Sequence, residues 1–485
     1  MMKLNRNNAK IDAAPTARIL QFGGGNFLRG FADWIVDVYN QKSADPMGVL
    51  VVKPTERGDY QAWREQDGLY HVLTKGIRDG ELMDEKHLVK CVGEIIHPYH
   101  NWQGFLRSAE NSNLRFILSN TTETGIRFSA EDQFSDAPPA EFPAKLTRWL
   151  YHRYEHFAGD PAMGCVLIPT ELLVDNGEEL KKAILQYVDA WSLDAGFTTW
   201  LNEANTFCNT LVDRIVPGVG KEEMTAALAQ AGFEDEMITQ GEPYHFWGIE
   251  APMAVREECP LDKIGLNIIY TDDLTPYRTS KVRILNGAHT AMVPVGYLYG
   301  ITTVRETVEH PIMGAFVQKV IFEEIMPTLD MKEEELKKFA KDVLDRFKNP
   351  FIHHQLISIA LNSVSKFKTR LLPSLLEYSK RKGALPEGIV LSLAALIRFY
   401  KGSFDGKTIP LKDEPWATSF LAAAWEQCDG SEAAIAVLVQ KVLQWKAAWS
   451  EDLSTVHGLQ KMLTDYLLQM DQEGGITNIV KRAIT

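Results

Sequence analysis

A lysine, an asparagine and a histidine follow one another in a K-x4-N-x2-H pattern and could do proton chemistry together. They are Lys281, Asn286 and His289. In an α-helix, at about 100° per residue, His289 lies about 80° and Asn286 about 140° from Lys281, so all three project from one broad face. An amine in this setting can exchange a proton with an alcohol, while the amide and the imidazole hold and polarise the reacting oxygen. The pattern predicts acid/base chemistry; the alternative, a solvated polar helix face, is the commoner case for any such trio.

The helix that carries this motif begins with a clear signal, Thr275 as cap and Pro276 at the first helical position. Lys281 then lies near the positive end of the helix dipole, and Arg278 lies about 60° from it on the same face. We expect both to disfavour the charged ammonium, as an acid/base lysine requires. The sequence from residue 286, NGAHTAMVPVGYL, is too apolar and small for a surface helix, which favours a functional site.

A glycine-rich turn directly follows a predicted strand at 17–22 and precedes a helical pattern at 27–40. Three consecutive glycines occupy 23–25. Glycines here let the turn be tight and let backbone N–H groups approach a pyrophosphate at the helix N-terminus. The usual third glycine would fall at Leu28, and Gly30 comes two residues late, so a ligand-free turn is an alternative. The strand–turn–helix context favours dinucleotide binding.

The second predicted strand, 48–53, leaves the choice of dinucleotide open. An acidic residue often ends this strand in NAD enzymes and holds the ribose hydroxyls. Here the strand ends in Lys53, with Glu56 and Arg57 shortly after it. Lys53 could equally accommodate a 2′-phosphate, so NAD and NADP both remain possible from the residues alone.

The elements that must position these motifs differ between the two halves of the chain. The first half alternates short apolar runs rich in β-branched residues with helical patterns, which is typical of a parallel sheet covered on both faces. The predicted strands are 17–22, 48–53, 114–120 and 163–170, and the helices are 27–40, 144–157 and 177–191. We therefore predict an α/β fold with a Rossmann-like, mostly parallel sheet.

The pattern of apolar residues in the second half indicates helices and no convincing strands. The predicted helical segments are 311–328, 332–348, 351–366, 386–401, 415–427 and 431–449. We expect a Rossmann-type domain over 1–275, followed by a mainly α-helical domain over 276–485.

Composition excludes several classes of protein. A formal charge of −13 argues against nucleic acid or an anionic membrane surface as the main partner, although one basic cluster would suffice for a small anionic substrate. Five scattered cysteines without a C-x-x-C spacing argue against disulfides and thiolate zinc, and they suit a reducing cytoplasm. There is no signal-peptide pattern and no run approaching the roughly 18 apolar residues of a membrane helix. The spacing of His97 and His100 is almost metal-like but lacks a carboxylate or thiolate companion, so we expect no metal.

With these residues in view, the chain resembles the polyol-specific long-chain dehydrogenases, the mannitol dehydrogenase family, nearly from end to end. The K-x4-N-x2-H element is highly specific to that family, whereas the glycine turn is not. The segments that carry the resemblance are RILQFGGGNFLRGF (18–31), QDGLY (66–70), RFILSNTTETGI (115–126), NTFCNTLVDRIV (205–216), KVRILNGAHTAMVP (281–294) and RFKNPFIHHQLISIALN (346–362).

The resemblance implies an NAD-binding Rossmann domain, a helical substrate and catalytic domain, and an active site in the cleft between them. It implies metal-free hydride transfer with Lys281 as proton donor and acceptor, and with Asn286 and His289 orienting the substrate oxygens. Asp213 and Lys366 match substrate-site positions. The NAD-binding segment would comprise Ile19, Leu20, Gln21, Phe22, Gly23, Gly24, Gly25, Asn26, Phe27, Leu28, Arg29 and Gly30.

Departures from the family pattern point to the substrate. Leu172 stands where mannitol-oxidising members have asparagine, Arg278 replaces a glutamate three residues before the catalytic lysine, and Ser358 replaces an arginine. Positive charge at Arg278 suits a substrate with a carboxylate, so we also expect this residue in the substrate site. The basic cluster 366–370 is a further candidate for holding a carboxylate, and a solvated helix end is as good an explanation of it.

The glycine turn is most similar to that of the members that reduce tagaturonate to altronate with NADH in hexuronate breakdown. The expected partner is therefore a small sugar acid, and the oligomeric state stays open. Alternatives are reduction of fructuronate, oxidation of mannitol, or an inactive NAD-binding protein; an intact Lys281, Asn286 and His289 argues against the last.

Overall fold

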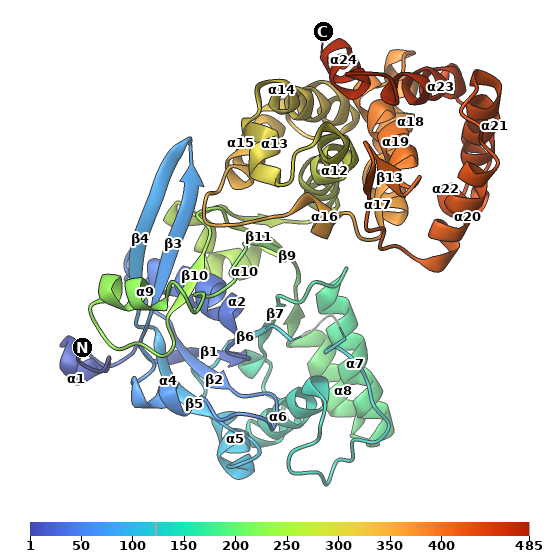
Figure 1. Ribbon diagram of the computed structural model, residues 1–485. Coiled ribbons are helices and arrows are strands. Elements are labelled where there is room, and N and C mark those ends of the chain that lie inside the picture. Colours follow the sequence, from blue (N-terminus) through green and yellow to red (C-terminus); the bar gives the residue numbers. More distant parts are fainter. Residues whose placement is uncertain (122–123, 485) are drawn as a thin grey trace. The chain divides into compact units, whose positions relative to one another are not determined.

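The computed structural model describes residues 1–121 and 124–484, which form two compact units (Figure 1). The first unit comprises Met1–Lys75 and Leu82–Leu274, and the second comprises Gly76–Glu81 and Thr275–Thr485. A short segment from early in the chain therefore belongs to the second unit. Within the described residues, no helix is long and apolar enough to cross a membrane.

The central sheet of the first unit has six parallel strands in the spatial order β5-β2-β1-β6-β7-β8. They are β1 (Ala17–Phe22), β2 (Gly48–Val52), β5 (Val92–Ile96), β6 (Phe116–Ser119), β7 (Val166–Pro169) and β8 (Thr206–Phe207). Counted along the chain within this sheet, the order is 3-2-1-4-5-6, the doubly wound arrangement with a reversal beside the first strand. The predicted Rossmann-like, mostly parallel sheet is confirmed.

The strands are apolar on both sides because both faces of the sheet are covered. Ile19, Val51 and Leu118 belong to one buried cluster. Leu20 and Ile117, which neighbour them in sequence, belong to the other. Successive side chains of a strand point to opposite faces, so a strand buried on both sides has to be apolar throughout, and this is why its pattern is continuous rather than alternating.

Helices cover the two faces. The cluster on one face includes side chains of α5, α6, α7 and α8, and the other face is covered by η1 and α3. The helical elements of the first unit are α1 (Arg6–Ala9), α2 (Asn26–Leu28), η1 (Arg29–Asp33), α3 (Trp34–Asn40), α4 (Gln61–Glu65), α5 (Trp102–Ser108), α6 (Phe142–His156), η2 (Pro161–Met163), α7 (Asn176–Ala190), α8 (Ala195–Glu203), α9 (Met224–Ala231), α10 (Met253–Glu258) and η3 (Leu261–Ile264).

Two small sheets accompany the central one. They are ordered β10-β3-β4 and β12-β11-β9, and β9 runs antiparallel to β11. Their strands are β3 (Tyr70–Arg78), β4 (Glu81–Val89), β9 (Asn209–Asp213), β10 (Thr239–Gly241), β11 (Phe246–Glu250) and β12 (Ile268–Thr271). The sequence did not predict β4 because its residues are mostly polar and exposed, so they carry no hydrophobic signal.

The second unit is mainly helical, as predicted. Its helical elements are α11 (Thr275–Ser280), η4 (Lys281–Asn286), α12 (Gly287–Tyr299), α13 (Val304–Glu309), α14 (Pro311–Lys319), η5 (Val320–Ile325), η6 (Met326–Thr328), α15 (Glu333–Phe347), α16 (Leu356–Ile359), α17 (Ser363–Arg370), α18 (Leu372–Lys382), α19 (Glu387–Phe399), α20 (Pro415–Glu426), α21 (Glu432–Leu443), α22 (Lys446–Trp449), η7 (Leu453–Thr455), α23 (Leu459–Met470) and α24 (Gly475–Ala483).

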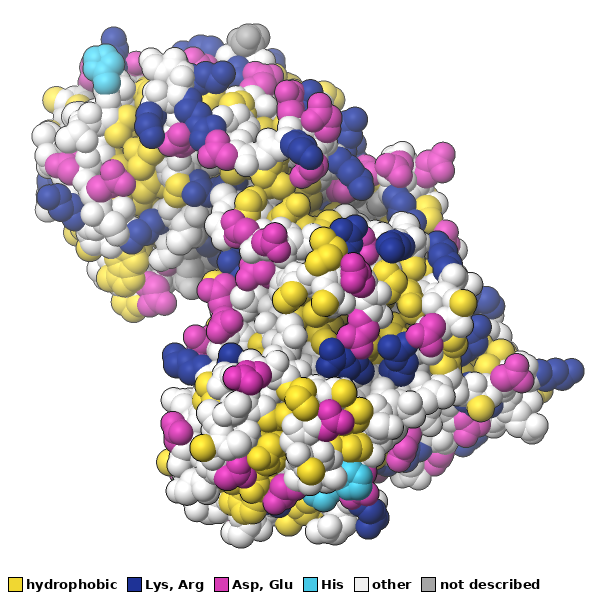
Figure 2. Space-filling model, turned by 180° about the vertical axis from the view of Figure 1, so that it is seen from behind, with side chains coloured by type: hydrophobic (Ala, Val, Ile, Leu, Met, Phe, Trp, Pro, Cys, Tyr) yellow, Lys and Arg dark blue, Asp and Glu magenta, His cyan; other side chains and the backbone are white. Residues whose placement is uncertain are grey.

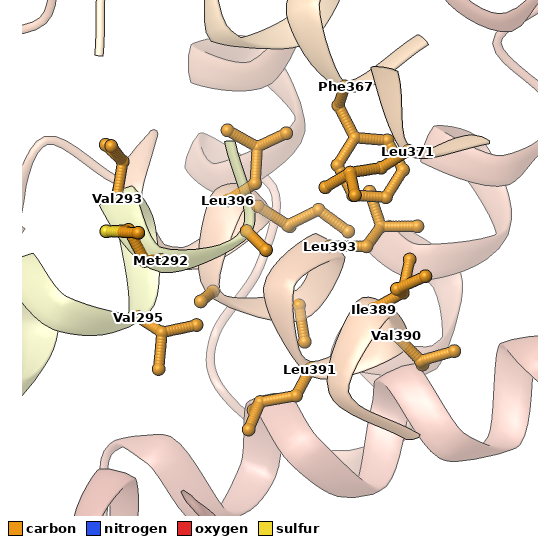
Figure 3. Close-up of a cluster of buried hydrophobic side chains, with 14 of the residues drawn as sticks. Met292, Val293, Val295, Phe367, Leu371, Ile389, Val390, Leu391, Leu393 and Leu396 are labelled. Carbon is orange, nitrogen blue, oxygen red and sulfur yellow. The ribbon is translucent and has the colours of Figure 1, made fainter. Parts of the chain in front are cut away.

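Helix α19 lies at the centre of this unit. Every residue of α19 from Gly388 to Phe399 is buried, as expected for a helix that is apolar all round. Figure 3 shows its side chains packed with those of α12 and with Phe367 and Leu371. The hydroxyl of Ser392 donates to the Ala291 carbonyl at 3.1 Å, which joins α19 to α12. This core fixes the helix that carries the K-x4-N-x2-H motif.

Two predictions for the second unit are wrong. The chain at 351–366 is not one helix: the segment before α16 is extended, and its backbone bonds go to 302–304, with the Val304 N–H donating to the His354 carbonyl at 3.0 Å. His353 and His354 therefore lie in a loop. A small hairpin, β13 (Ser403–Phe404) and β14 (Lys407–Thr408), also interrupts the helices.

Charge is mixed over the visible surface. On the face that Figure 2 displays, Lys and Arg side chains are interspersed with Asp and Glu side chains. That face therefore shows no large area of a single charge.

Candidate functional site

The glycine turn follows β1 at the point where the order of the strands reverses. Gly23 has a φ of +117° and donates its N–H to the Val52 carbonyl at 3.0 Å. A Cβ at Gly23 would lie 3.1 Å from the Asn120 carbonyl oxygen, which follows β6, and one at Gly24 would lie 2.6 Å from Trp63. Both glycines are therefore required by the protein's own packing.

Gly25 differs from its two neighbours. A Cβ there would meet no heavy atom within 4 Å, and its φ of −68° suits any residue. Gly25 caps α2 without a side-chain hydrogen bond, so the backbone N–H groups of the first helical turn lie beside open space. This is the space that a pyrophosphate needs at a helix N-terminus, and the turn fits a dinucleotide.

Gly30 is required by the protein's own packing. A Cβ at Gly30 would lie 2.6 Å from a methyl group of Val216. The Gly30 carbonyl accepts from Arg214 Nη1 at 2.6 Å, and the Arg214 guanidinium stacks 4.2 Å from the Trp34 ring centroid. Leu28, at the usual glycine position, instead packs against Gly23. Gly30 thus permits the close approach of η1 to Val216, which follows β9, and not to a strand of the central sheet.

Lys53, just after β2, is held by the protein. Its Nζ donates to the Thr55 carbonyl at 3.0 Å and to Thr55 Oγ1 at 2.7 Å, and it lies 5.1 Å from the Tyr60 ring centroid. Burial lowers the pKa of Lys53, with a smaller opposing effect of Asp59. The Lys53 ammonium is therefore hydrogen-bonded to Thr55, close to the end of β2.

A buried polar network lies beneath the glycine turn. Asp33 is fully buried, and its Oδ2 accepts from Tyr70 Oη at 2.8 Å and from Gln21 Nε2 at 3.4 Å. Gln21 Nε2 also donates to the Gly23 carbonyl at 3.2 Å. Burial raises the pKa of Asp33 to about 7, and the hydrogen bonds from Tyr70 and Gln21 lower it in part. Asp33 was not predicted as a site residue; its position in an otherwise apolar helical pattern was the available signal.

In the second unit, the motif lies on one continuous helical stretch, α11–η4–α12. The middle of it, η4, is π-helical, and the Gly287 N–H donates to the Val282 carbonyl, five residues back. In such a turn residues i and i+5 are hydrogen-bonded neighbours, so Lys281 and Asn286 lie closer to one face than α-helical geometry predicts. The helix begins at Thr275, as predicted, and Lys281 lies in its second turn.

His289 is an uncharged imidazole without a hydrogen-bond partner at one nitrogen. Its Nε2 is shielded from solvent and has no partner within the described residues. The ring lies 4.4 Å from Phe347 and 5.3 Å from His354, centroid to centroid. Burial lowers the pKa of His289 well below its ordinary value, and the nearby positive charges lower it further; these belong to His354, Arg346, Arg370 and Lys366. A neutral imidazole can accept or donate one hydrogen bond to a ligand oxygen.

Helix α17 brings two cations towards this face. Arg370 Nη1 lies 3.4 Å from Thr290 Oγ1, which itself donates to the Asn286 carbonyl at 2.9 Å. Lys366 donates to the Ile359 carbonyl at 2.7 Å, and its pKa is lowered by burial and by Arg370. Of the residues expected in the substrate site, Asn286, His289 and Lys366 thus lie in one neighbourhood.

The remaining predicted positions are distributed as follows. Arg278 is in α11, one turn before Lys281, and both are partly buried. Asp213 ends β9 in the first unit, where it pairs with Phe246. Leu172 is 65% exposed. Arg346, buried near His289, was not predicted as a site residue; it begins the segment 346–362 that carries the resemblance but has no spacing signal of its own.

Comparison with known proteins yields matches along nearly the whole chain. The family model described as the mannitol dehydrogenase Rossmann domain matches residues 17–263, and that of the mannitol dehydrogenase C-terminal domain matches 273–471. A protein of Yersinia enterocolitica named altronate oxidoreductase is 44% identical over 475 residues, covering 98% of each chain. One of the same name from Bacillus subtilis is 46% identical, covering 98% of this chain and 97% of its own.

Two solved structures share the fold. The substrate-free form of a D-sorbitol dehydrogenase matches with a TM-score of 0.78 at 21% identity, covering 100% of both chains. A mannitol 2-dehydrogenase of Pseudomonas fluorescens, solved with NAD and D-mannitol, matches with a TM-score of 0.65 at 20% identity, covering 99% of both. At these identities the likeness concerns the fold alone.

Replacing Gly25 by alanine is expected to weaken binding of a nicotinamide dinucleotide about tenfold or more, the effect of about 1.4 kcal/mol, because the added methyl group occupies the open space. Stability should not change, since the methyl group meets no protein atom. Gly30→Ala is the matched contrast and should lower the unfolding midpoint through its clash with Val216. Fluorescence titration and thermal unfolding measure the two effects; equal dinucleotide affinity in Gly25→Ala and wild type would contradict the assignment.

Asp33 should make stability depend on pH. Its folded pKa of about 7 lies above the ordinary 3.8, so between these values the folded chain keeps a proton that the unfolded chain has lost, and stability falls as pH rises. Relative to Asp33→Asn, the wild type should lose about 1–3 kcal/mol between pH 5 and pH 8 in urea unfolding. Tyr70→Phe removes a bond that favours the carboxylate and should extend the decline to higher pH. Parallel pH curves for wild type and Asp33→Asn would refute the shift.

Proposed function

The chain belongs to the mannitol dehydrogenase family, and from this we propose that it is an altronate oxidoreductase, which interconverts D-tagaturonate and D-altronate with NAD. The observation that carries the proposal is the 44% and 46% identity, over almost the full length of both partners, to relatives of that name. The site supports it with a proton-transfer trio and a group of cations suited to a sugar acid. In the reductive direction the ketone gains a hydride at carbon and a proton at oxygen.

Lys281 is the proton donor in this proposal. The bound nicotinamide would supply the hydride to the keto carbon. The oxygen then carries negative charge, and Lys281 Nζ gives it a proton; in the reverse direction the neutral amine removes the proton of the alcohol. No described group of three or more His, Cys, Asp and Glu side chains could hold a metal ion. In this proposal, protein groups polarise the carbonyl.

Asn286 and His289 hold the reacting end of the sugar. The Asn286 amide can donate to the carbonyl oxygen, and His289 Nε2 can bind an oxygen as donor or acceptor according to its tautomer. Because His289 stays neutral, it does not compete with Lys281 as the acid, and it adds no charge to a face already rich in cations. Asp213 remains a proposed substrate contact by family resemblance, and Arg278 remains one because its positive charge suits a carboxylate.

The hydrogen bonds that Lys53 makes within the protein favour NAD over NADP as the cofactor. A lysine that binds a 2′-phosphate has to present its ammonium to the ligand. Lys53 is 5% exposed, and its ammonium donates to Thr55 instead. The segment Ile19–Gly30, with open space at Gly25, would hold the pyrophosphate.

A substrate panel tests the proposal. With NADH, we expect kcat/KM for tagaturonate to be at least about tenfold higher than kcat/KM for fructuronate or fructose. We expect the same margin over the values measured for all three substrates with NADPH. EDTA should leave the rate unchanged. A clear preference for fructuronate or fructose would replace the assignment by another member of the family, and no turnover with any substrate would favour a binding protein.

Lys281→Ala should lower turnover by roughly 10²–10⁴-fold, because it removes the proton donor, while leaving NADH affinity intact. Lys332→Ala is a matched control, since the Lys332 side chain is 81% exposed and pairs with Glu335 at its helix start. Single-turnover absorbance of NADH and fluorescence titration measure the two quantities. Near-wild-type turnover in Lys281→Ala would exclude this lysine as the acid.

A further inference from the structure

We propose that α17 carries the subsite for the carboxylate of the sugar acid, with the guanidinium of Arg370 as its main ligand and Lys366 beside it. The inference rests on the proposed function and deepens it, because it says which group separates sugar acids from neutral sugars. Arg370 and Lys366 are four residues apart on α17, so their side chains are neighbours on one helix face.

Contacts place Arg370 next to the reacting end of the site. Its Nη1 lies 3.4 Å from Thr290 Oγ1, and Thr290 directly follows His289 in α12. Thr290 in turn donates to the Asn286 carbonyl at 2.9 Å. One threonine hydroxyl therefore separates the guanidinium from the backbone of the motif, and a six-carbon acid bound at its ketone could reach Arg370 with its far end.

The charge on α17 lacks a nearby counter-ion. In the described part of the chain, neither Arg370 nor Lys366 forms an ion pair with a carboxylate. Burial lowers the pKa of Arg370 without an opposing acid, and Asp413 opposes only weakly the lowering at Lys366. A partly buried guanidinium normally binds a carboxylate, often by two parallel hydrogen bonds. Here one long contact to a hydroxyl leaves most of its donors for a ligand.

His289 provides an independent observation for the same place. Its shielded Nε2 has no hydrogen-bond partner among the described residues, which is a costly state for a buried polar atom. Arg370 and Lys366 are both close enough to disfavour its protonation. A ligand with hydroxyl groups near the imidazole and a carboxylate near the guanidinium would satisfy both groups at once.

Two other cations compete for this role. Arg278 lies in α11, one turn before Lys281, and it is not among the groups that chiefly lower the pKa of His289, whereas Arg370 is. Lys368, in the basic cluster of α17, lies about 200° around the helix from Lys366, so the helix separates it from the other two. The geometry thus selects Arg370 from the candidates that the sequence offered.

The test compares Arg370→Gln, Arg370→Lys, Arg278→Gln and Lys368→Gln in the full-length enzyme. Each is assayed with NADH on tagaturonate, fructuronate and fructose, and titrated calorimetrically with D-altronate in the presence of NAD. Arg370→Gln should lower the ratio of kcat/KM for the acids to that for fructose about 30- to 1000-fold, mainly through KM, and weaken altronate binding by a similar factor. Arg370→Lys should recover part of the ratio, and Lys368→Gln should keep it.

The other possible outcomes decide between the carboxylate subsite and the altronate assignment. The subsite is overturned if kcat/KM falls equally for the acids and for fructose in both Arg370 variants. It is also overturned if Arg278→Gln or Lys368→Gln changes the ratio of kcat/KM as much as Arg370→Gln does. If Arg370→Gln does not fold, the ratio in Arg370→Lys decides alone. A wild type that prefers fructuronate and loses it in Arg370→Gln refutes the altronate assignment but supports the subsite. A wild type that reduces fructose alone refutes both.

Discussion

An imidazole kept uncharged among cations is the interaction on which the chemistry of the helical unit depends. Burial lowers the pKa of His289 well below its ordinary value, and the surrounding positive charge lowers it further. Arg370 and Lys366, among the described residues, form no ion pair with a protein carboxylate. An acid that neutralised Arg370 would remove the positive charge that we propose for binding a carboxylate. The apolar packing of α12 against α19 maintains this balance, since it fixes the backbone from which the imidazole projects.

Burial is used differently in the first unit. There it holds a carboxyl group, Asp33, beneath a backbone turn, where Gln21 links it to the Gly23 carbonyl. The turn itself is defined by glycines that the protein needs for its own packing and by one, Gly25, that leaves space for a ligand. In both units a polar group is desolvated by an apolar surrounding, and in both the polar group lies next to the backbone segment expected to bind a ligand.

The sequence predicted the elements whose signal is local. Strands buried on both faces, such as β1 and β2, are apolar throughout, and the glycine turn and the K-x4-N-x2-H spacing are contiguous. The exposed strand β4, the extended chain before α16 and the π-helical turn η4 were not predicted. Their conformations depend on partners distant in sequence, as the bond between Val304 and His354 illustrates. The same reason explains the site: Lys281 and His289 share a helix, whereas the proximity of Arg370 to Thr290 exists only in the folded chain.

The hairpin of β3 and β4 has a consequence for the ancestry of the chain. Its tip, Gly76–Glu81, belongs to the second unit, where the Gly80 amide donates to Asp345 Oδ2 at 3.1 Å. Cutting the gene between codons 274 and 275 would therefore yield one fragment with a surplus loop and another with a missing one. Neither half of the gene encodes one complete unit. Recombination that exchanges the second half among relatives would therefore also have to exchange the loop Gly76–Glu81.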